Sequence, residues 1–111
     1  MSIIISQTNK GKIEHCKGCD RFYLAYENIL LCFTEFEYYH FERLLFNIEV
    51  EQWVEYNKEF GHKKFIPIQT EQRNLTLMLD ENDLVQLKQL FLGENNKILN
   101  INEIRIDYLP N

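Results

Sequence analysis

The stretch "NILLCFTEFEYYHFERLL", residues 28–45, has an echo further along the chain in "NLTLMLDENDLVQLKQLF", residues 74–91. The two stretches align without a gap, and each begins with an asparagine followed by apolar residues that alternate with a period of two. Such alternation is typical of a strand with one buried face. The apolar residues that follow recur at helical spacing. The alignment therefore predicts one strand–helix unit that is used twice.

The residues between strand and helix predict where both helices begin. Thr34 is expected to be the N-cap of the first helix, and Glu37, three residues later, completes a capping box. Asp80 takes the same place in the second copy, followed by the acidic Glu81 and Asp83 near the positive end of the helix. We expect the second helix to end at Gly93, because glycine tolerates the left-handed conformation that caps many helices.

A further strand is expected before each unit. "RFYLAYE", residues 21–27, places Phe22, Leu24 and Tyr26 on one face, and "KFIPI", residues 64–68, is its counterpart. Asn28 is expected to close the first hairpin, because asparagine tolerates positive φ. The sequence thus predicts an α+β fold. Two pseudo-repeated ββα units would form a mainly antiparallel four- or five-stranded sheet with two helices on one face. An alternative to the repeat stays open: two amphipathic strand–helix units can resemble each other by chance.

Length and composition predict a single domain over residues 1–111, with halves at about 12–48 and 62–93 and a C-terminal extension at 94–111. Apolar residues make up 45% of the chain, which argues against disorder. The net charge of −5 disfavours nucleic-acid binding, which relies on basic patches. No apolar run approaches the roughly 20 residues of a membrane span. With no signal peptide recognised and three cysteines, we expect a cytoplasmic protein.

The first helix carries more aromatic residues than one buried face requires. A second stripe falls away from the core stripe, whereas the matching positions in the second helix are more polar. Three parts could pack on this second stripe: the segment around Trp53, the C-terminal stretch from residue 97 to 109, or another protein chain. The C-terminal stretch fits either a strand or a helix. The expected interaction surface consists of Phe36, Tyr39, Arg43, Phe46 and Trp53. The second face of the sheet, with Leu30, Cys32, Tyr23, Ala25, Thr76 and Met78, also reads as too apolar to be fully wetted.

"EHCKGCDRFY", residues 14–23, is the stretch that most resembles a chemical site. A Cys-x-x-Cys turn can supply two corners of a zinc tetrahedron, here Cys16 and Cys19. Zinc needs two more ligands, for which His62 and His15 are the next candidates, or the same pair from a second copy. Cys32 aligns with Met78 and reads as a small buried hydrophobe. A redox role is disfavoured, because the motif runs into a strand instead of opening a helix. A turn with incidental thiols stays open.

These residues also support a resemblance to a known family. The series "HCKGCDRFYLAYENI", "FTEFEYYHF", "IPI" and "NLTLM" resembles a family of small uncharacterised bacterial proteins, a domain of unknown function typical of Bacteroidetes. The resemblance covers about residues 6–92 and leaves 93–111 outside. It implies no activity, but it draws attention to the cysteine pair. Its motif falls on Cys16, Cys19, Tyr23, Leu24, Asn28, Ile29, Pro67, Asn74, Leu75 and Thr76.

Three functions follow from these features. The leading hypothesis is a non-enzymatic binding module that self-associates or binds a protein partner, with no nucleic-acid or membrane partner. The alternative is a small structural zinc protein that uses Cys16 and Cys19, so the cofactor is either none or zinc. An enzyme is the third, with Glu35, Glu37, His40 and Glu42 as an acid–base set, although a capped and solvated acidic face explains the same residues.

Overall fold

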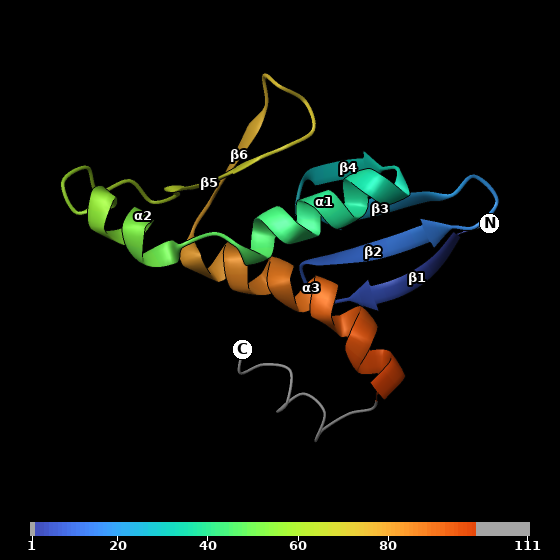
Figure 1. Cartoon of the computed structure of the whole chain (residues 1–111). Coiled ribbons are helices and arrows are strands. Elements are labelled where there is room, and N and C mark those ends of the chain that lie inside the picture. The colour runs from blue at the N-terminus through green and yellow to red at the C-terminus, as the bar shows by residue number, and fades with distance from the viewer. Residues whose placement is uncertain (1, 100–111) are drawn as a thin grey trace.

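The computed structural model describes the backbone of residues 2–99 and the side chains of residues 2–93 (Figure 1). Four strands come first and form one antiparallel sheet in the order of the sequence. Two helices, a separate two-stranded sheet and a long third helix follow. The elements are β1 (Ser2–Gln7), β2 (Gly11–Cys16), β3 (Arg21–Tyr26), β4 (Ile29–Phe33), α1 (Glu35–Phe46), α2 (Val50–Asn57), β5 (Ile66–Gln69), β6 (Thr76–Leu79) and α3 (Glu81–Leu99).

The α+β class is confirmed, but the four-stranded sheet is built from other strands than expected. β3 and β4 pair where the alternation predicts them, with Leu24 opposite Leu31. The other two strands of this sheet are β1 and β2, which the sequence pattern did not predict. In the described part of the chain, β5 and β6 pair with each other and not with the large sheet. The second hairpin therefore forms a sheet of its own.

The bulge in β1 explains why its pattern does not read as a strand. The register with β2 shifts between Ile4 and Ser6, so that Ile4 lies opposite Glu14 and Ser6 lies opposite Ile13. One extra residue interrupts the period of two that identifies a half-buried strand. As a result, the polar Ser6 is buried on the core face, while Ile4 is exposed.

The core lies between the large sheet and the helices on one of its faces. α3 packs against β1 and β2, and α1 packs against β3 and β4 (Figure 1). Aromatic rings join the layers: Phe22 stacks on Tyr38 at 4.1 Å between ring centres, and Tyr38 lies 5.1 Å from Phe91. The predicted inward face of β3 is confirmed, because Phe22, Leu24 and Tyr26 are all buried.

Both predicted helix starts are present. The Thr34 hydroxyl accepts a hydrogen bond from the backbone amide of Glu37, whose carboxylate accepts one from the amide of Thr34. Asp80 and Asp83 make the same reciprocal pair at the start of α3. β3–β4–α1 and β5–β6–α3 thus have the same order of elements and similar caps. That they form an internal repeat stays a prediction.

Two expectations about chain reversals are wrong. α3 does not end at Gly93 but continues to Leu99. A Cβ at Gly93 would lie 2.6 Å from the Ser6 hydroxyl oxygen, so this glycine marks a close approach of helix and sheet. In the β3–β4 hairpin the positive φ falls on Glu27, at 51°, and not on Asn28.

The segment after α1, around Trp53, forms a separate short helix, α2. Of the C-terminal extension, residues 94–99 lie in α3. A strand or a helix up to residue 109 is one expected cover of the first helix. Most of that stretch lies within residues 100–111, outside the described part. Within residues 2–99, no helix combines the length and the apolar character that crossing a membrane requires.

Candidate functional site

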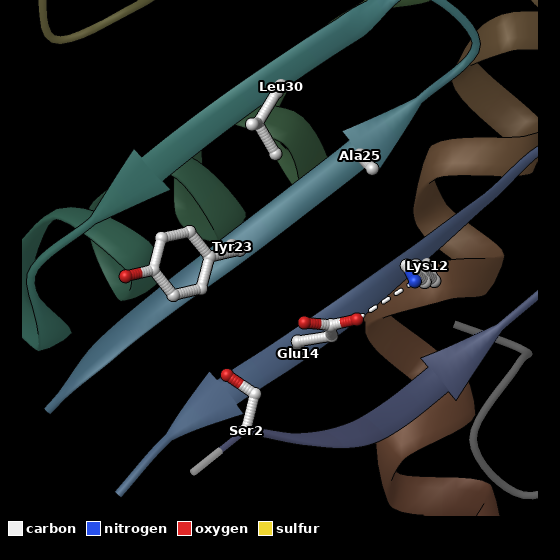
Figure 2. A pocket seen from close by; sticks show the side chains of 6 residues that line it. All are labelled: Ser2, Lys12, Glu14, Tyr23, Ala25 and Leu30. Atoms are coloured by element: carbon white, nitrogen blue, oxygen red, sulfur yellow. Dashed lines mark ion pairs between the residues drawn. The ribbon is translucent and has the colours of Figure 1, made fainter. Parts of the chain in front are cut away.

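The face of the large sheet that points away from the helices holds a shallow cavity of about 390 Å³. Figure 2 shows its lining side chains, which rise from β1, β2, β3 and β4. Strand alternation places them there, since their neighbours Ile13, Leu24 and Tyr26 point into the core. The cavity is lined by Ser2, Lys12, Glu14, Tyr23, Ala25 and Leu30.

This cavity is apolar along β3 and β4 and charged along β2. Leu30 is 68% exposed and lies beside Ala25, whereas Lys12 Nζ contacts Glu14 Oε2 at 2.9 Å. The two charges neutralise each other, so the cavity favours neither an anion nor a cation. The expectation that this face is covered finds no support in the described residues, because Leu30 is strongly exposed. Met78, which was expected on the same face, lies in the separate β5–β6 sheet and is exposed as well.

Three thiols and a phenol gather at one end of this face, where β2 ends and β3 begins. Cys16 is the last residue of β2, Cys19 lies in the turn that follows, and Cys32 lies opposite Tyr23 on β4. In Figure 2 the hydroxyl of Tyr23 points toward this end of the sheet. The interpretation of Cys32 as a buried hydrophobe is wrong, because Cys32 is exposed. Its face of the sheet is not packed against the helices.

Cys16 and Cys19 are close to each other. The backbone amide of Cys19 donates a hydrogen bond to Cys16 Sγ at 3.4 Å. The side chain of Cys19, the amide of Cys19 and the amide of Gly18 all donate to this sulfur and lower the pKa of the Cys16 thiol, against the effect of burial. The hydrogen bond with the Cys19 side chain and the electrostatic interaction between the two groups raise the pKa of the Tyr23 hydroxyl.

The structure does not bring the two proposed histidine ligands to the cysteine pair. His15 is paired with Phe22 in the register and stacks on its ring at 4.2 Å, and adjacent strand residues such as His15 and Cys16 point to opposite faces. His15 Nε2 lies 3.6 Å from Asp20 Oδ1, too far for a hydrogen bond.

His62 follows α2, where its backbone amide and carbonyl are both bound by the side chain of Asn57. Figure 1 shows this loop and the β2–β3 turn at opposite ends of the molecule. Among residues 2–93, no group of three or more His, Cys, Asp and Glu side chains is arranged to hold a metal ion.

His40 has a carboxylate partner that the sequence did not indicate. Its Nδ1 lies 2.7 Å from Glu71 Oε2, and its ring stacks against Phe36. Glu37, one of the three carboxylates in the predicted acid–base set, is occupied as a helix cap. Because the side chains of His40 and Glu71 are 37% and 33% exposed, water competes for both groups. The pair lacks the enclosure that usually tunes a catalytic acid or base.

The second stripe of α1 lies at the molecular surface. Phe36 is 74% exposed, Tyr39 and Phe46 are also exposed, and a second hollow of about 380 Å³ is bounded by Tyr39, Glu42, Arg43 and Phe46. Lys88 Nζ lies 5.6 Å from the centre of the Phe46 ring. Phe36, Tyr39, Arg43 and Phe46, together with the half-buried Trp53 of α2, are called the aromatic surface below.

Two further exposed rings extend this surface beyond the predicted residues. Tyr56 packs edge-on against Trp53 at 6.1 Å, and Phe60 lies 5.0 Å from Tyr56. Gln52, Trp53 and Tyr56 bound a hollow of about 410 Å³. The helical spacing of Trp53 and Tyr56, followed by Phe60, is visible in the sequence and could have indicated one face of a helix.

Comparison with known proteins returns one finding. A family model described as "Family of unknown function (DUF6686)" matches residues 1–111. No curated protein and no solved structure matches the chain. The expectation of a domain of unknown function is thereby confirmed, while the bacterial group and the role of the cysteine motif stay predictions.

Proposed function

The chain belongs to DUF6686, a family of unknown function, and from its surface we propose a non-enzymatic module that binds another protein chain through the aromatic surface. The observation that carries this proposal is the exposure of Phe36, at 74%, beside the exposed Tyr39 and Phe46. Aromatic side chains are enriched in protein interfaces, and contiguous apolar patches on soluble proteins usually mark contacts.

A second copy of the chain is the partner that we propose first. The hollow around Tyr39 and Phe46 is bounded by both an acidic and a basic residue, Glu42 and Arg43. Two copies of a surface with mixed charge can face each other about a twofold axis without bringing only like charges together. A strongly single-signed patch would instead point to a partner of opposite charge.

Light scattering of the purified chain over a range of concentrations tests self-association. We expect a dimer or larger species for the wild type and a shift toward monomer for Phe36→Ser and Phe46→Ser. Leu30→Ser is the matched control, because Leu30 is also a strongly exposed apolar residue, at 68%, but lies on the sheet face outside the aromatic surface. A wild-type monomer at high micromolar concentration would contradict self-association. Photo-crosslinking from position 36 would then show whether another chain occupies the surface.

Structural zinc binding by Cys16 and Cys19 is the second candidate function that we propose. It is supported by the closeness of the two thiols and by the amide hydrogen bond to Cys16 Sγ. Elemental analysis of protein purified without a histidine tag, after growth with added zinc, tests this candidate. A zinc content equal to that of the Cys16→Ser, Cys19→Ser double variant would contradict it.

A further inference from the structure

We propose that Cys16 and Cys19 form one half of a zinc site that a second copy of the chain completes. Four thiolates, two from each copy, would then hold a single zinc ion. The proposal rests on the zinc-binding candidate above and adds its stoichiometry, its remaining ligands and its partner.

The number of available ligands leads to this arrangement. Structural zinc is almost always bound by four ligands in a closed tetrahedron. The described part of one chain supplies the cysteine pair, and no third His, Cys, Asp or Glu side chain is arranged with it as a ligand. His15 points to the opposite face of the sheet from Cys16, and His62 follows α2 at the far end of the molecule. A second identical pair supplies the two missing thiolates without moving either histidine.

The turn is accessible to a second copy. Cys19 is exposed, Cys16 is partly exposed, and a Cβ built on Gly18 would meet no atom within 4 Å. Figure 1 shows that the β2–β3 turn projects at one end of the molecule, beyond the helices. Two such turns can therefore approach each other without the displacement of a helix or strand.

The backbone of the turn suits a metal-bound thiolate. The amide of Cys19 donates to Cys16 Sγ at 3.4 Å, which directs a partial positive charge at the sulfur. Hydrogen bonds of this kind orient metal ligands and stabilise their negative charge. They come from local backbone, so they are in place before any metal binds.

The charges around the turn favour the assembled site. A zinc ion with four thiolates carries two net negative charges. Lys17 lies between the two cysteines and Arg21 follows them, while Asp20 is the one acidic residue among residues 16–21, so each turn brings one net positive charge. Two turns together offset the charge of the site. Arg21 also lies opposite Cys16 in the β2–β3 register. This local balance counters the repulsion between two chains that each carry a net charge of −5.

Native mass spectrometry together with elemental analysis tests the proposal on the full chain, purified without a tag, reduced, and loaded with zinc. We expect one zinc ion per two chains, found in the dimer and lost together with that dimer on addition of EDTA. Cys16→Ser and Cys19→Ser should lose both the zinc and the zinc-dependent dimer. Cys32→Ser is the matched control, because Cys32 is an exposed thiol on the same face but not in the turn, and it should retain both.

Cobalt(II) provides a readout that a merely structural role of the turn would not change. The wild type loaded with cobalt should show the intense visible absorption of a tetrahedral tetrathiolate, and Cys16→Ser and Cys19→Ser should lose it. Circular dichroism of these metal-free variants should match the wild type, because the thiols lie at the surface. One zinc ion per monomer, a zinc-dependent dimer that persists in Cys16→Ser, or equal loss in Cys32→Ser would overturn the proposal.

Different changes test the zinc-dependent dimer and the association through the aromatic surface. Phe36→Ser should leave the zinc-dependent dimer intact, because Phe36 is not a ligand of the proposed zinc site. EDTA should in turn leave any association through the aromatic surface intact. The proposed zinc site and the proposed aromatic interface can therefore be refuted independently of each other.

Discussion

The hydroxyl of Tyr26 donates a hydrogen bond of 2.8 Å to Oδ1 of Asp83. Tyr26 ends β3 and Asp83 lies in the first turn of α3, so the bond joins the large sheet to the last helix. Lys64 Nζ contacts the other oxygen, Oδ2, at 2.6 Å, and the backbone amide of Asp80 donates to the same atom. Burial by itself would raise the pKa of Asp83, but these donors lower it from 3.8 to about 2.

Replacing Asp83 by Asn should remove an acid-sensitive contribution to stability. The folded-state pKa lies below the unfolded value, so this contribution is fully present above pH 3.8 and is lost as the pH falls toward about 2. We expect Asp83→Asn to lower the free energy of unfolding at pH 7 by about 2 kcal/mol. Urea denaturation should show a smaller difference between wild type and variant near pH 2. Glu81→Gln, an exposed change in the same turn, is the control.

Replacing Tyr26 by Phe should test the hydrogen bond alone. The variant keeps the buried ring but leaves one oxygen of Asp83 without its phenol donor, which should cost about 1 kcal/mol of unfolding free energy. Tyr23→Phe removes a hydroxyl from the other face of the same strand and should have a smaller effect. Equal losses in the two variants would show that the bond to Asp83 contributes little.

Gly11→Ala should destabilise the protein through overlap with its neighbours. A Cβ at Gly11 would collide with the carbonyl oxygen of Ala25 and lie 3.2 Å from Leu90 Cδ1. Because the first of these atoms belongs to the backbone of the next strand, it cannot rotate away. We expect a loss of roughly 1–3 kcal/mol in thermal or urea denaturation. Gly18→Ala, with open space around it, should change stability by less than about 0.5 kcal/mol.

Thr34→Ala should weaken the start of α1. The Thr34 hydroxyl accepts the amide hydrogen of Glu37 at 3.1 Å, and loss of such a cap typically costs about 1 kcal/mol. Thr34→Ser keeps a hydroxyl in the same place and should restore most of the loss in urea denaturation. If serine were no better than alanine, the cap would not be the cause.

Cys32 should react rapidly with a thiol reagent in the native protein. It is exposed on the open face of the sheet, as is Cys19 in the turn. We expect Ellman's reagent to label both without denaturant, and Cys32→Ser to reduce the number of rapidly reacting thiols by one. Labelling of Cys32 that required urea would instead support the interpretation of this residue as a buried hydrophobe.

Local patterns predicted the features that depend on near neighbours in the chain. Thr34 and Glu37 cap α1 as expected, because both partners of the capping box lie within one turn. The alternation of Phe22, Leu24 and Tyr26 identified the inward face of β3. The exposure of Phe36 also follows from its position on the helical wheel.

Other features depend on contacts between distant segments. β1 was missed because a bulge hides its alternation, and Gly93 was misread because its neighbour Ser6 is far away in the sequence. The cavity residues Ser2, Lys12 and Glu14 were missed with β1 and β2. Cys32 lies on the second face of the sheet, as the alternation predicted, but its exposure was missed because alternation does not tell whether another segment covers that face.

The α+β class, the helix starts and the aromatic excess of the first helix can be predicted from the sequence, because periodicity and caps act over a few residues. The tertiary structure alone decided that β1 and β2 complete the large sheet and that β5 and β6 stay separate from it. It also decided that Tyr26, Asp83 and Lys64 meet, and that His15 stacks on Phe22 of the neighbouring strand. Strand pairing, register and burial of a second face are set by long-range packing, which no short window of sequence contains.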